Sequence, residues 1–153
     1  MKRHHALEPF SRDHYGGLVV ARHLKEKPGS ESIAELMQVW NGEMEDHFRE
    51  EELTLSPLAP PEMAARLYRD HDDIRALVAT AARNLSEEDA VELGHRIHDH
   101  IRWEERELFP ALEADERLID IEPAAEAMEL RRQDSGLYPR RAELVQRRKP
   151  SDN

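Results

Sequence analysis

The most informative chemical pattern in this chain is a histidine followed four residues later by a glutamate. It occurs twice, as His47/Glu51 and as His100/Glu104. Because residues i and i+4 lie on one face of a helix, each pair can bind a single ion. Two further histidines, His14 and His71, fall on two other predicted helices. Imidazole and carboxylate together suit iron, zinc or manganese, so the pattern predicts a paired metal centre inside a four-helix bundle.

Spacing alone identifies no ligand, because the chain is rich in acidic residues. With 33 acidic residues among 153, about two of the nine histidines should have a carboxylate at i+4 by chance. His4/Glu8 and His95/Asp99 also fit the spacing. His95 lies about 140° around its helix from His100 by the 3.6-residue period. We therefore predict that four histidines lie outside the centre: His4, His23, His95 and His98.

Composition narrows the classes of function. Lys and Arg number 22 against 33 Asp and Glu, which gives a net charge of −11 and argues against nucleic acid or an anionic membrane as partner. The absence of cysteine excludes disulfides, thiolate metal sites and thiol nucleophiles. No stretch approaches the ~18 apolar residues of a membrane span. We expect a soluble, cytoplasmic protein.

Abundant Ala, Leu, Glu and Arg, with no alternating strand pattern, predict an all-α fold. Four helices are expected. They run from about residue 11 to 27, from Ser32 to before Pro57, from Pro60-Pro61 to about 85, and from after Ser86 to about Pro110. Ser32 is predicted to open a capping box with Glu35, and Ser86 to be an N-cap. Short connections favour an antiparallel up-down-up-down four-helix bundle.

This topology brings the candidate ligands to one height. His14 lies near the start of its helix and Glu51 near the end of the next, and His71 and Glu104 follow the same alternation. At 1.5 Å per residue, all six candidates fall within roughly 10 Å in height. The four aromatic residues Trp40, Phe48, Trp103 and Phe109 are interpreted as core walls that keep the centre dry.

The character of the chain changes after Pro123. From there on, seven Lys/Arg against five Asp/Glu give a net charge of +2, whereas the preceding body carries −13. We predict a bundle domain over residues 1–122 and a C-terminal extension over 123–153. The extension is expected to contain one short helix from 122 to 132 and then a frayed basic tail.

The chain resembles the hemerythrin-like (HHE cation-binding) family over roughly residues 10 to 110. The matching stretches are Phe10-Ser-Arg-Asp-His14, His47-Phe-Arg-Glu-Glu51, Asp70-His71-Asp-Asp-Ile-Arg75 and His100-Ile-Arg-Trp-Glu104-Glu-Arg-Glu-Leu-Phe-Pro110. The resemblance implies an antiparallel four-helix bundle around a non-haem di-iron centre, with an oxo or hydroxo bridge as one form and other divalent metals as substitutes. It further implies that His14, His47, His71 and His100 are terminal ligands and that Glu51 and Glu104 bridge the two ions.

One position departs from the oxygen-carrying members of this family. They place a further histidine one turn after the third-helix ligand, where this chain has Arg75. Sharing the six ligands evenly leaves both ions unsaturated, which suits reaction with O2, peroxide or nitric oxide better than reversible carriage. Tyr15, Glu43 or water could fill a coordination position, and Tyr15 is interpreted first as an aromatic lid.

Alternative interpretations stay open at this point. The leading hypothesis is a protein that binds or reacts with a small oxidant, and whether it is an enzyme is not decided. A second is an iron- or oxygen-sensing module that signals to a protein partner or a second copy through the basic C-terminal segment. A third is iron storage or delivery.

Two other kinds of metal site do not fit the motifs of the chain. A ferritin-like site needs Glu-x-x-His on two helices, and Glu92-x-x-His95 is the single such motif in the chain. A zinc hydrolase lacks its His-Glu-x-x-His motif.

Overall fold

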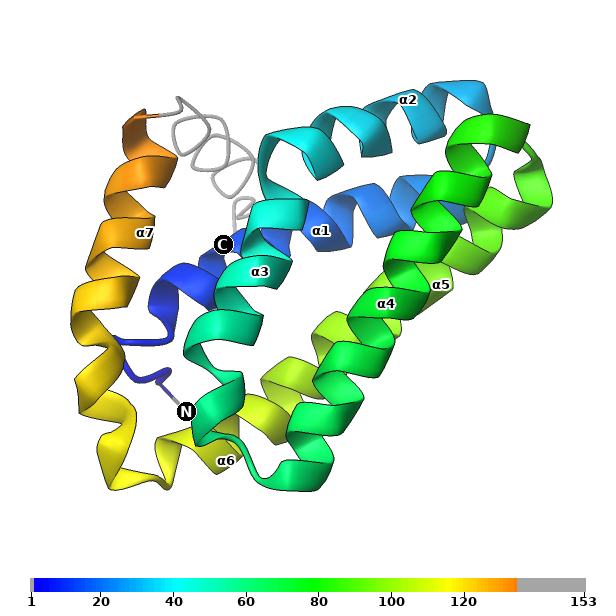
Figure 1. Ribbon diagram of the computed structural model, residues 1–153. Helices are drawn as coiled ribbons and strands as arrows, with labels where there is room; N and C mark the ends of the chain where they lie inside the picture. The colour runs from blue at the N-terminus through cyan, green and yellow to red at the C-terminus, as the bar shows by residue number, and fades with distance from the viewer. Residues whose placement is uncertain (1, 135–153) are drawn as a thin grey trace, which may run out of the picture.

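The predicted all-α fold is confirmed by the computed structural model, which describes residues 2–134. Every element in this part of the chain is helical. The bundle is formed by α1 (Glu8–Glu26), α2 (Ser30–Val39) continued by α3 (Glu45–Thr54), α4 (Pro61–Asn84) and α5 (Glu87–Trp103) (Figure 1). None of these helices combines the length and apolar character that crossing a membrane would require.

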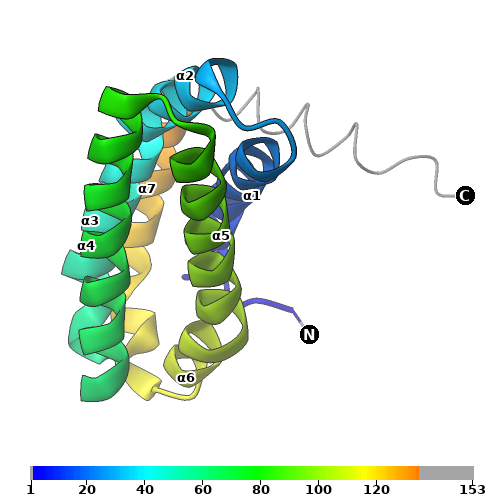
Figure 2. The same ribbon diagram turned by 90° about the vertical axis from the view of Figure 1, so that its right-hand side faces the viewer.

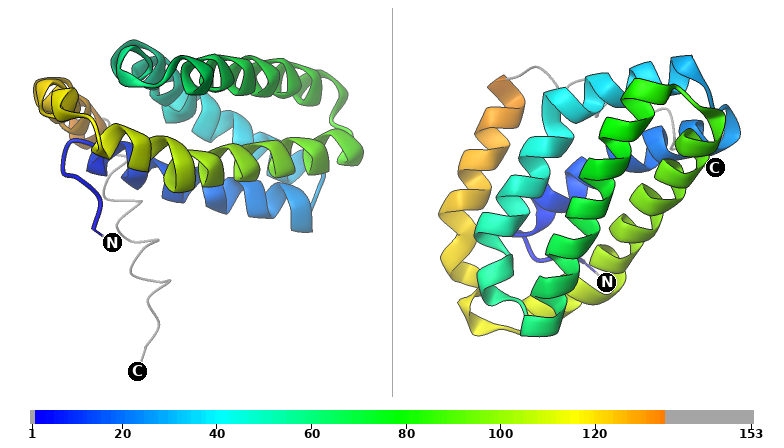
Figure 3. Two further views of the ribbon diagram at one scale, coloured as in Figure 1. Left: turned by 90° about the horizontal axis from the view of Figure 1, so that it is seen from below. Right: turned by 45° about the vertical axis from the view of Figure 1, so that its right-hand side comes forward.

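The helices are arranged as an antiparallel bundle. α1 packs against α2 and α5, and α4 packs against α2, α3 and α5. Figure 2 shows α4 and α5 side by side with a short connection at one end, while α1 and α2 are seen nearly end-on and run at an angle to this pair. Figure 3 shows the same helices from two further directions. The connection between α3 and α4 includes a single 3-10 turn, η2 (Ser56–Leu58). The up-down-up-down order expected from the connection lengths is therefore the order observed.

Two helices begin where their capping serine or first-turn proline predicts, and one does not. Ser86 caps α5, because its Oγ accepts a hydrogen bond from the Asp89 N–H at 3.1 Å. Pro61 occupies the first turn of α4, where its missing N–H leaves no bond unmade. The predicted N-cap role of Ser32 is wrong. Helix α2 begins at Ser30 after Gly29, and the Ser32 side chain instead accepts a bond from the Gly29 N–H at 3.2 Å.

Two π-helical turns interrupt helices that were expected to be continuous. η1 (Trp40–Met44) separates α2 from α3, and the chain bends there (Figure 1). η3 (Glu104–Leu108) separates α5 from the short α6 (Phe109–Glu113). Glycine weakens the first helix at Gly42, and Pro110 donates no bond to the turn before it. Such π turns are frequent at functional sites.

Two apolar clusters fill the bundle. Cluster A lies where α1, α2, α4 and α5 meet and includes Leu24, Leu36, Ile74 and Leu93. Cluster B joins the opposite ends of the helices to the segment before α1 and to α6, and includes Leu7, Phe10, Leu67 and Phe109. On α1, His14 lies between Phe10 of cluster B and Val20 of cluster A.

The chain continues beyond α6 with a 3-10 segment, η4 (Glu116–Ile121), and a final helix, α7 (Glu122–Asp134). The short helix expected over 122–132 is thus present. α7 lies beside the start of α1 and beside α3 (Figures 1 and 3), and its Ala125 and Met128 belong to cluster B. The predicted frayed tail falls on residues 135–153, outside the described residues. The proposed boundary at residue 122 stays a prediction.

Candidate metal centre

The six candidate ligands meet in the middle of the bundle, and each is at most 5% exposed. Their positions are His14 on α1, His47 and Glu51 on α3, His71 on α4, His100 on α5 and Glu104 at the first residue of η3. On α4, for example, His71 lies between Leu67 of cluster B and Ile74 of cluster A. The surrounding apolar packing removes water from the donors, so their charges must be balanced locally.

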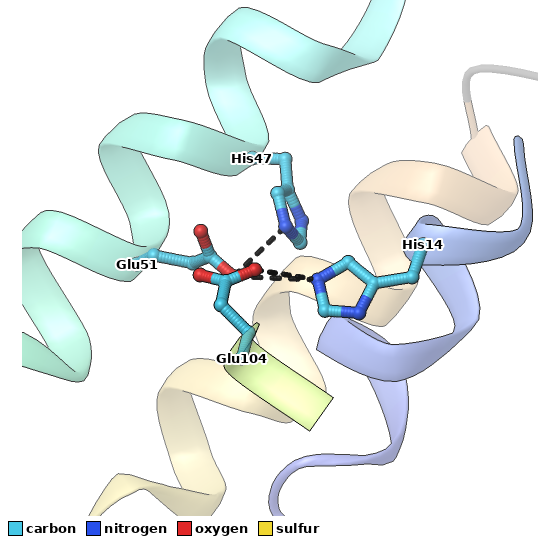
Figure 4. Close-up of side chains that lie close together, drawn as sticks. All are labelled: His14, His47, Glu51 and Glu104. Carbon is cyan, nitrogen blue, oxygen red and sulfur yellow. Dashed lines mark ion pairs between the residues drawn. The ribbon is translucent and has the colours of Figure 1, made fainter. Parts of the chain in front are cut away.

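The donors form two groups that share both glutamates. The His14 group consists of His14, His47, Glu51 and Glu104, and the His71 group consists of His71, His100, Glu51 and Glu104. In each group, one donor atom from every residue lies within 4.8 Å of the others. Figure 4 shows the His14 group, with both imidazoles directed at the two carboxylates.

Each glutamate presents one oxygen to each group. Glu51 Oε2 lies 2.9 Å from His47 Nε2, and its Oε1 lies 3.2 Å from His71 Nε2. In the same way, Glu104 Oε1 lies 2.9 Å from His14 Nε2, and its Oε2 lies 3.3 Å from His100 Nε2. This is the arrangement of a carboxylate that connects two neighbouring cations.

The contacts between the imidazole nitrogens and the carboxylate oxygens of these donors are short but lack the geometry of hydrogen bonds. Among residues 2–134, the Nε2 atoms of His14 and His47 and all four carboxylate oxygens of Glu51 and Glu104 are buried without a hydrogen-bond partner. Buried polar atoms are otherwise nearly always paired. Donors that face a common point rather than one another fit a cation between them, so these residues fit a pair of metal ions.

The two histidines of the His71 group support the same conclusion. Their Nε2 atoms face each other at 3.1 Å. The Nδ1 of His71 lies 2.7 Å from Glu52, and the Nδ1 of His100 lies 3.2 Å from Asp70. When both Nδ1 atoms donate to these carboxylates, both Nε2 atoms present lone pairs to each other. That contact is repulsive unless a proton or a cation lies between them.

Without a cation, protons balance the charge of the centre. Burial by itself lowers the pKa of His47, but the charge of Glu51 and the hydrogen bond with Asp13 outweigh it and raise the pKa to about 10. Burial acts likewise on His100, whose pKa Glu104 and Asp70 raise to about 9. Burial favours the neutral form of Glu51, yet the neighbouring histidines hold its pKa well below the ordinary value. A metal ion must therefore displace protons in order to bind.

Four further carboxylates, outside the two donor groups, orient the imidazoles. None of the four was predicted from the sequence. Each accepts from the Nδ1 of one histidine: Glu105 from His14 at 2.7 Å, Asp13 from His47 at 3.0 Å, Glu52 from His71 at 2.7 Å and Asp70 from His100 at 3.2 Å. Such carboxylate–histidine pairs fix the ring and leave Nε2 for the metal. Each of these carboxylates is the immediate neighbour in sequence of a candidate ligand, which is the signal that could have identified them.

An arginine stands behind each of these carboxylates. The pairs are Arg3 with Glu105 at 2.9 Å, Arg132 with Asp13 at 3.2 Å, Arg75 with Glu52 at 2.9 Å and Arg66 with Asp70 at 3.4 Å. Arg75 bonds both oxygens of Glu52 and lies over the Phe48 ring. Arg75, which stands where the oxygen-carrying members of the family have a histidine, therefore supports the His71 ring through Glu52.

Aromatic side chains enclose the donors, as predicted. Phe48 stacks on His71 with a centroid distance of 3.9 Å, and Phe109 stacks on His14 at 5.4 Å. Trp40 and Trp103 are also buried. These rings exclude water and restrict the rotation of the imidazoles.

A cavity of about 10 Å³ adjoins the His14 group. Its apolar lining comes from Gly17, Met44, Phe48 and Ile101. The buried carboxylate of Glu43, one turn before His47, also lines it. This volume corresponds to about one water-sized probe. Tyr15 is half-buried and lies outside both donor groups.

The histidines predicted to lie elsewhere do so. His95 is exposed, His98 pairs with Asp99 at 3.3 Å, and His23 pairs with Glu35 at 2.9 Å. His4 belongs to a separate, partly exposed group with His5 and Glu122 at the molecular surface.

Comparison with known proteins adds one finding. A family model, described as the hemerythrin HHE cation binding domain, matches residues 4–112 and so covers more than half of the chain. No curated protein and no solved structure matches the chain significantly. The matched region contains all six candidate ligands and ends before α7.

Proposed function

The chain belongs to the hemerythrin HHE cation-binding domain family, and from this premise we propose that it is a di-iron protein that binds or reacts with a small oxidant, namely O2, peroxide or nitric oxide. Membership of the family implies that the chain binds metal cations. The identity of the metal and its reactivity are the parts that we propose.

The donor chemistry supports iron. Two imidazoles and two carboxylate oxygens per ion make a set of intermediate hardness, which suits iron better than an all-oxygen or a thiolate site would. When bound, a pair of iron ions supplies reversible electron transfer and coordination positions that the protein does not fill. With Arg75 tied to Glu52, α4 contributes His71 alone to the two donor groups. This favours reaction with a small molecule over carriage.

The cavity beside the His14 group is the observation that carries the proposal. Its volume of about 10 Å³, about one water-sized probe, limits a guest to a very small molecule and excludes organic substrates. Its wall combines the apolar residues Gly17, Met44 and Ile101 with the donor side chains of the centre and two further carboxylates, those of Asp13 and Glu43. The apolar part of the wall favours an uncharged guest beside the donors. A diatomic gas or peroxide meets these limits.

The test uses the full chain loaded with iron, reduced without air, and mixed separately with O2, hydrogen peroxide and nitric oxide in a stopped-flow spectrophotometer. We expect an optical change with at least one of the three. The zinc-loaded protein is the matched control and should remain silent, because zinc has no redox chemistry. Iron that binds but gives no response to any of the three reagents would contradict the proposal. If that iron also leaves readily to a chelator, storage or delivery is the better account.

A further inference from the structure

The side chain of Arg132 enters the bundle from α7, a helix outside the region that matches the family. It is 4% exposed, although arginine is rarely buried without a paired charge. Its Nη2 lies 3.2 Å from Asp13 Oδ2 and 2.6 Å from Glu50 Oε1, and its Nε lies 3.3 Å from Asp13 Oδ2. The fork of the guanidinium thus joins α7 to α1 and α3 at once.

The same oxygen of Asp13 that contacts Arg132 also faces the centre. Asp13 Oδ2 lies 3.0 Å from His47 Nδ1, and Asp13 immediately precedes His14. A continuous chain of contacts therefore runs from Arg132 through Asp13 to His47. Without the arginine, this buried carboxylate would lose the partner that holds its Oδ2 from the side opposite His47, and its orientation toward His47 would be less favoured.

The backbone of α7 is held firmly enough to place this arginine. Ala125 and Met128 are buried in cluster B. Two further ion pairs on the surface, Arg12–Glu129 and Arg131–Glu50, fasten the helix to α1 and α3. These contacts make α7 a wall of the bundle beside the His14 group. The corresponding carboxylates of the His71 group, Glu52 and Asp70, are instead paired with Arg75 and Arg66, which lie on α4.

We infer that α7 is part of the metal centre: Arg132 is a positioning residue that holds Asp13, and through it the Nδ1–H of His47, so that cation binding by the His14 group depends on α7 whereas binding by the His71 group does not. The inference rests on the metal-binding part of the proposed function and is independent of any reaction with an oxidant.

The experiment compares full-length Arg132→Met with full-length Arg131→Met. Arg131 is the adjacent residue, is 58% exposed and contacts Glu50 but not Asp13 in the described ion pairs, so it controls for loss of the Glu50 contact. Zinc, the redox-silent probe, is titrated against a competing chelator and counted per chain. We expect Arg131→Met to bind two ions as the parent does. In Arg132→Met one ion should bind about 10- to 100-fold more weakly, the usual effect of losing such a supporting residue, and the other should be unchanged.

A second variant and a metal-free measurement keep the outcome decisive. Asp13→Asn removes the same charge from α1 without altering α7 and should weaken the same single ion. In metal-free protein labelled with 15N at the imidazoles, the Nδ1–H signal of His47 should exchange faster with solvent in Arg132→Met, and that of His71 should not. Wild-type affinity for both ions in Arg132→Met, or an equal loss of both, overturns the inference. Absence of zinc binding by the parent chain counts against the proposed function, while the NMR comparison still decides whether Arg132 positions His47.

Discussion

Each imidazole of the centre is held at one nitrogen and directed at the shared glutamates with the other. The Nδ1 of His14 lies 2.7 Å from Glu105, while its Nε2 lies 2.9 Å from Glu104. The arrangement repeats at the other three histidines with different carboxylates. A ring fixed in this way has few orientations to lose when it binds a cation, which favours binding.

Replacing Glu51 tests whether one glutamate serves both groups. We expect Glu51→Ala to lose both ions, because Glu51 directs one oxygen at His47 and the other at His71. Elemental analysis of iron-reconstituted protein measures the loss. His98→Ala is the control and should retain two ions, since His98 pairs with Asp99 away from the donors. One ion retained by Glu51→Ala, or iron lost by His98→Ala, would contradict this assignment.

The raised histidine pKa values predict how the metal-free protein responds to pH. A histidine whose pKa is higher in the folded than in the unfolded state stabilises the fold fully below about 6.5. This contribution is lost as the pH rises through the folded values, about 9 for His100 and about 10 for His47. We therefore expect the melting temperature of metal-free protein to fall between pH 8 and pH 10.

Zinc affinity measured over the same range should rise, because fewer protons compete for the donors. A metal-free melting temperature that stays flat over this interval would show that the histidines are not protonated in the folded state.

The proximity of the six candidate ligands could be predicted from the sequence, because two pairs share the i/i+4 spacing and the alternating helix order brings all six to one height. The supporting carboxylates could not, since Asp13 and Glu52 look like ordinary surface acids in a chain with 33 of them. Their role depends on which helix packs opposite, and this is decided by tertiary contacts. The role of Arg75 could not be predicted for the same reason, because its partner Glu52 lies on another helix.

At the scale of the elements, the π turns set the register of the ligands. η1 ends three residues before His47, and η3 begins at Glu104. A π turn accommodates an extra residue and rotates the helix beyond it, so it changes the face on which the next side chains lie. The uniform 3.6-residue period predicted that the two members of each pair, His47/Glu51 and His100/Glu104, lie on one helix face, and they do. It could not predict the bend between α2 and α3, since no single residue type specifies a π turn.

The contact between α1 and α5 depends on a glycine. A Cβ at Gly94 would lie 2.8 Å from the Ala21 carbonyl oxygen and 2.8 Å from Lys25 Cγ. Alanine favours a helix over glycine by about 1 kcal/mol, whereas overpacking costs about 1–3 kcal/mol. The Ala21 carbonyl belongs to the backbone and cannot rotate away. We therefore expect Gly94→Ala to lower the free energy of unfolding by about 1–2 kcal/mol, measured by chemical denaturation.

Gly17→Ala is the matched control for this substitution. Its Cβ would meet only the flexible tip of Ile101, at 2.8 Å, and a side-chain rotation can relieve that contact. Equal effects of the two substitutions would argue against the close helix approach as the cause.

At the scale of the whole molecule, the polar centre is enclosed between two apolar clusters. Cluster A is supplied by the bundle helices, and cluster B by the opposite ends of these helices together with the segment before α1, α6, η4 and α7. The bundle could be predicted from the helix-favouring composition and from the short connections between the expected helices. The contact of Ala125 and Met128 with the other end could not be predicted, because a short helix with many charged residues gives no indication of where it docks.

Metal removal should lower stability without unfolding the protein. Cations that bind only the folded state stabilise it by about 2.7 kcal/mol at a hundredfold excess over Kd. For a chain of this length, that corresponds to a rise in melting temperature of about 5–10 °C. The chelated protein should keep its helical circular dichroism, because both apolar clusters are independent of the donors. Collapse of the helical signal on chelation would mean that the metal, rather than the clusters, holds the bundle together.

The most direct test of a shared two-cation centre is a crystal structure of the iron-loaded protein with anomalous diffraction recorded at the iron edge. We predict two anomalous peaks between the four helices, one contacted by His14 and His47, the other by His71 and His100, with Glu51 and Glu104 contacting both. A map with no peak among these six side chains, or with a single peak and the remaining donors bonded to one another, would contradict this prediction.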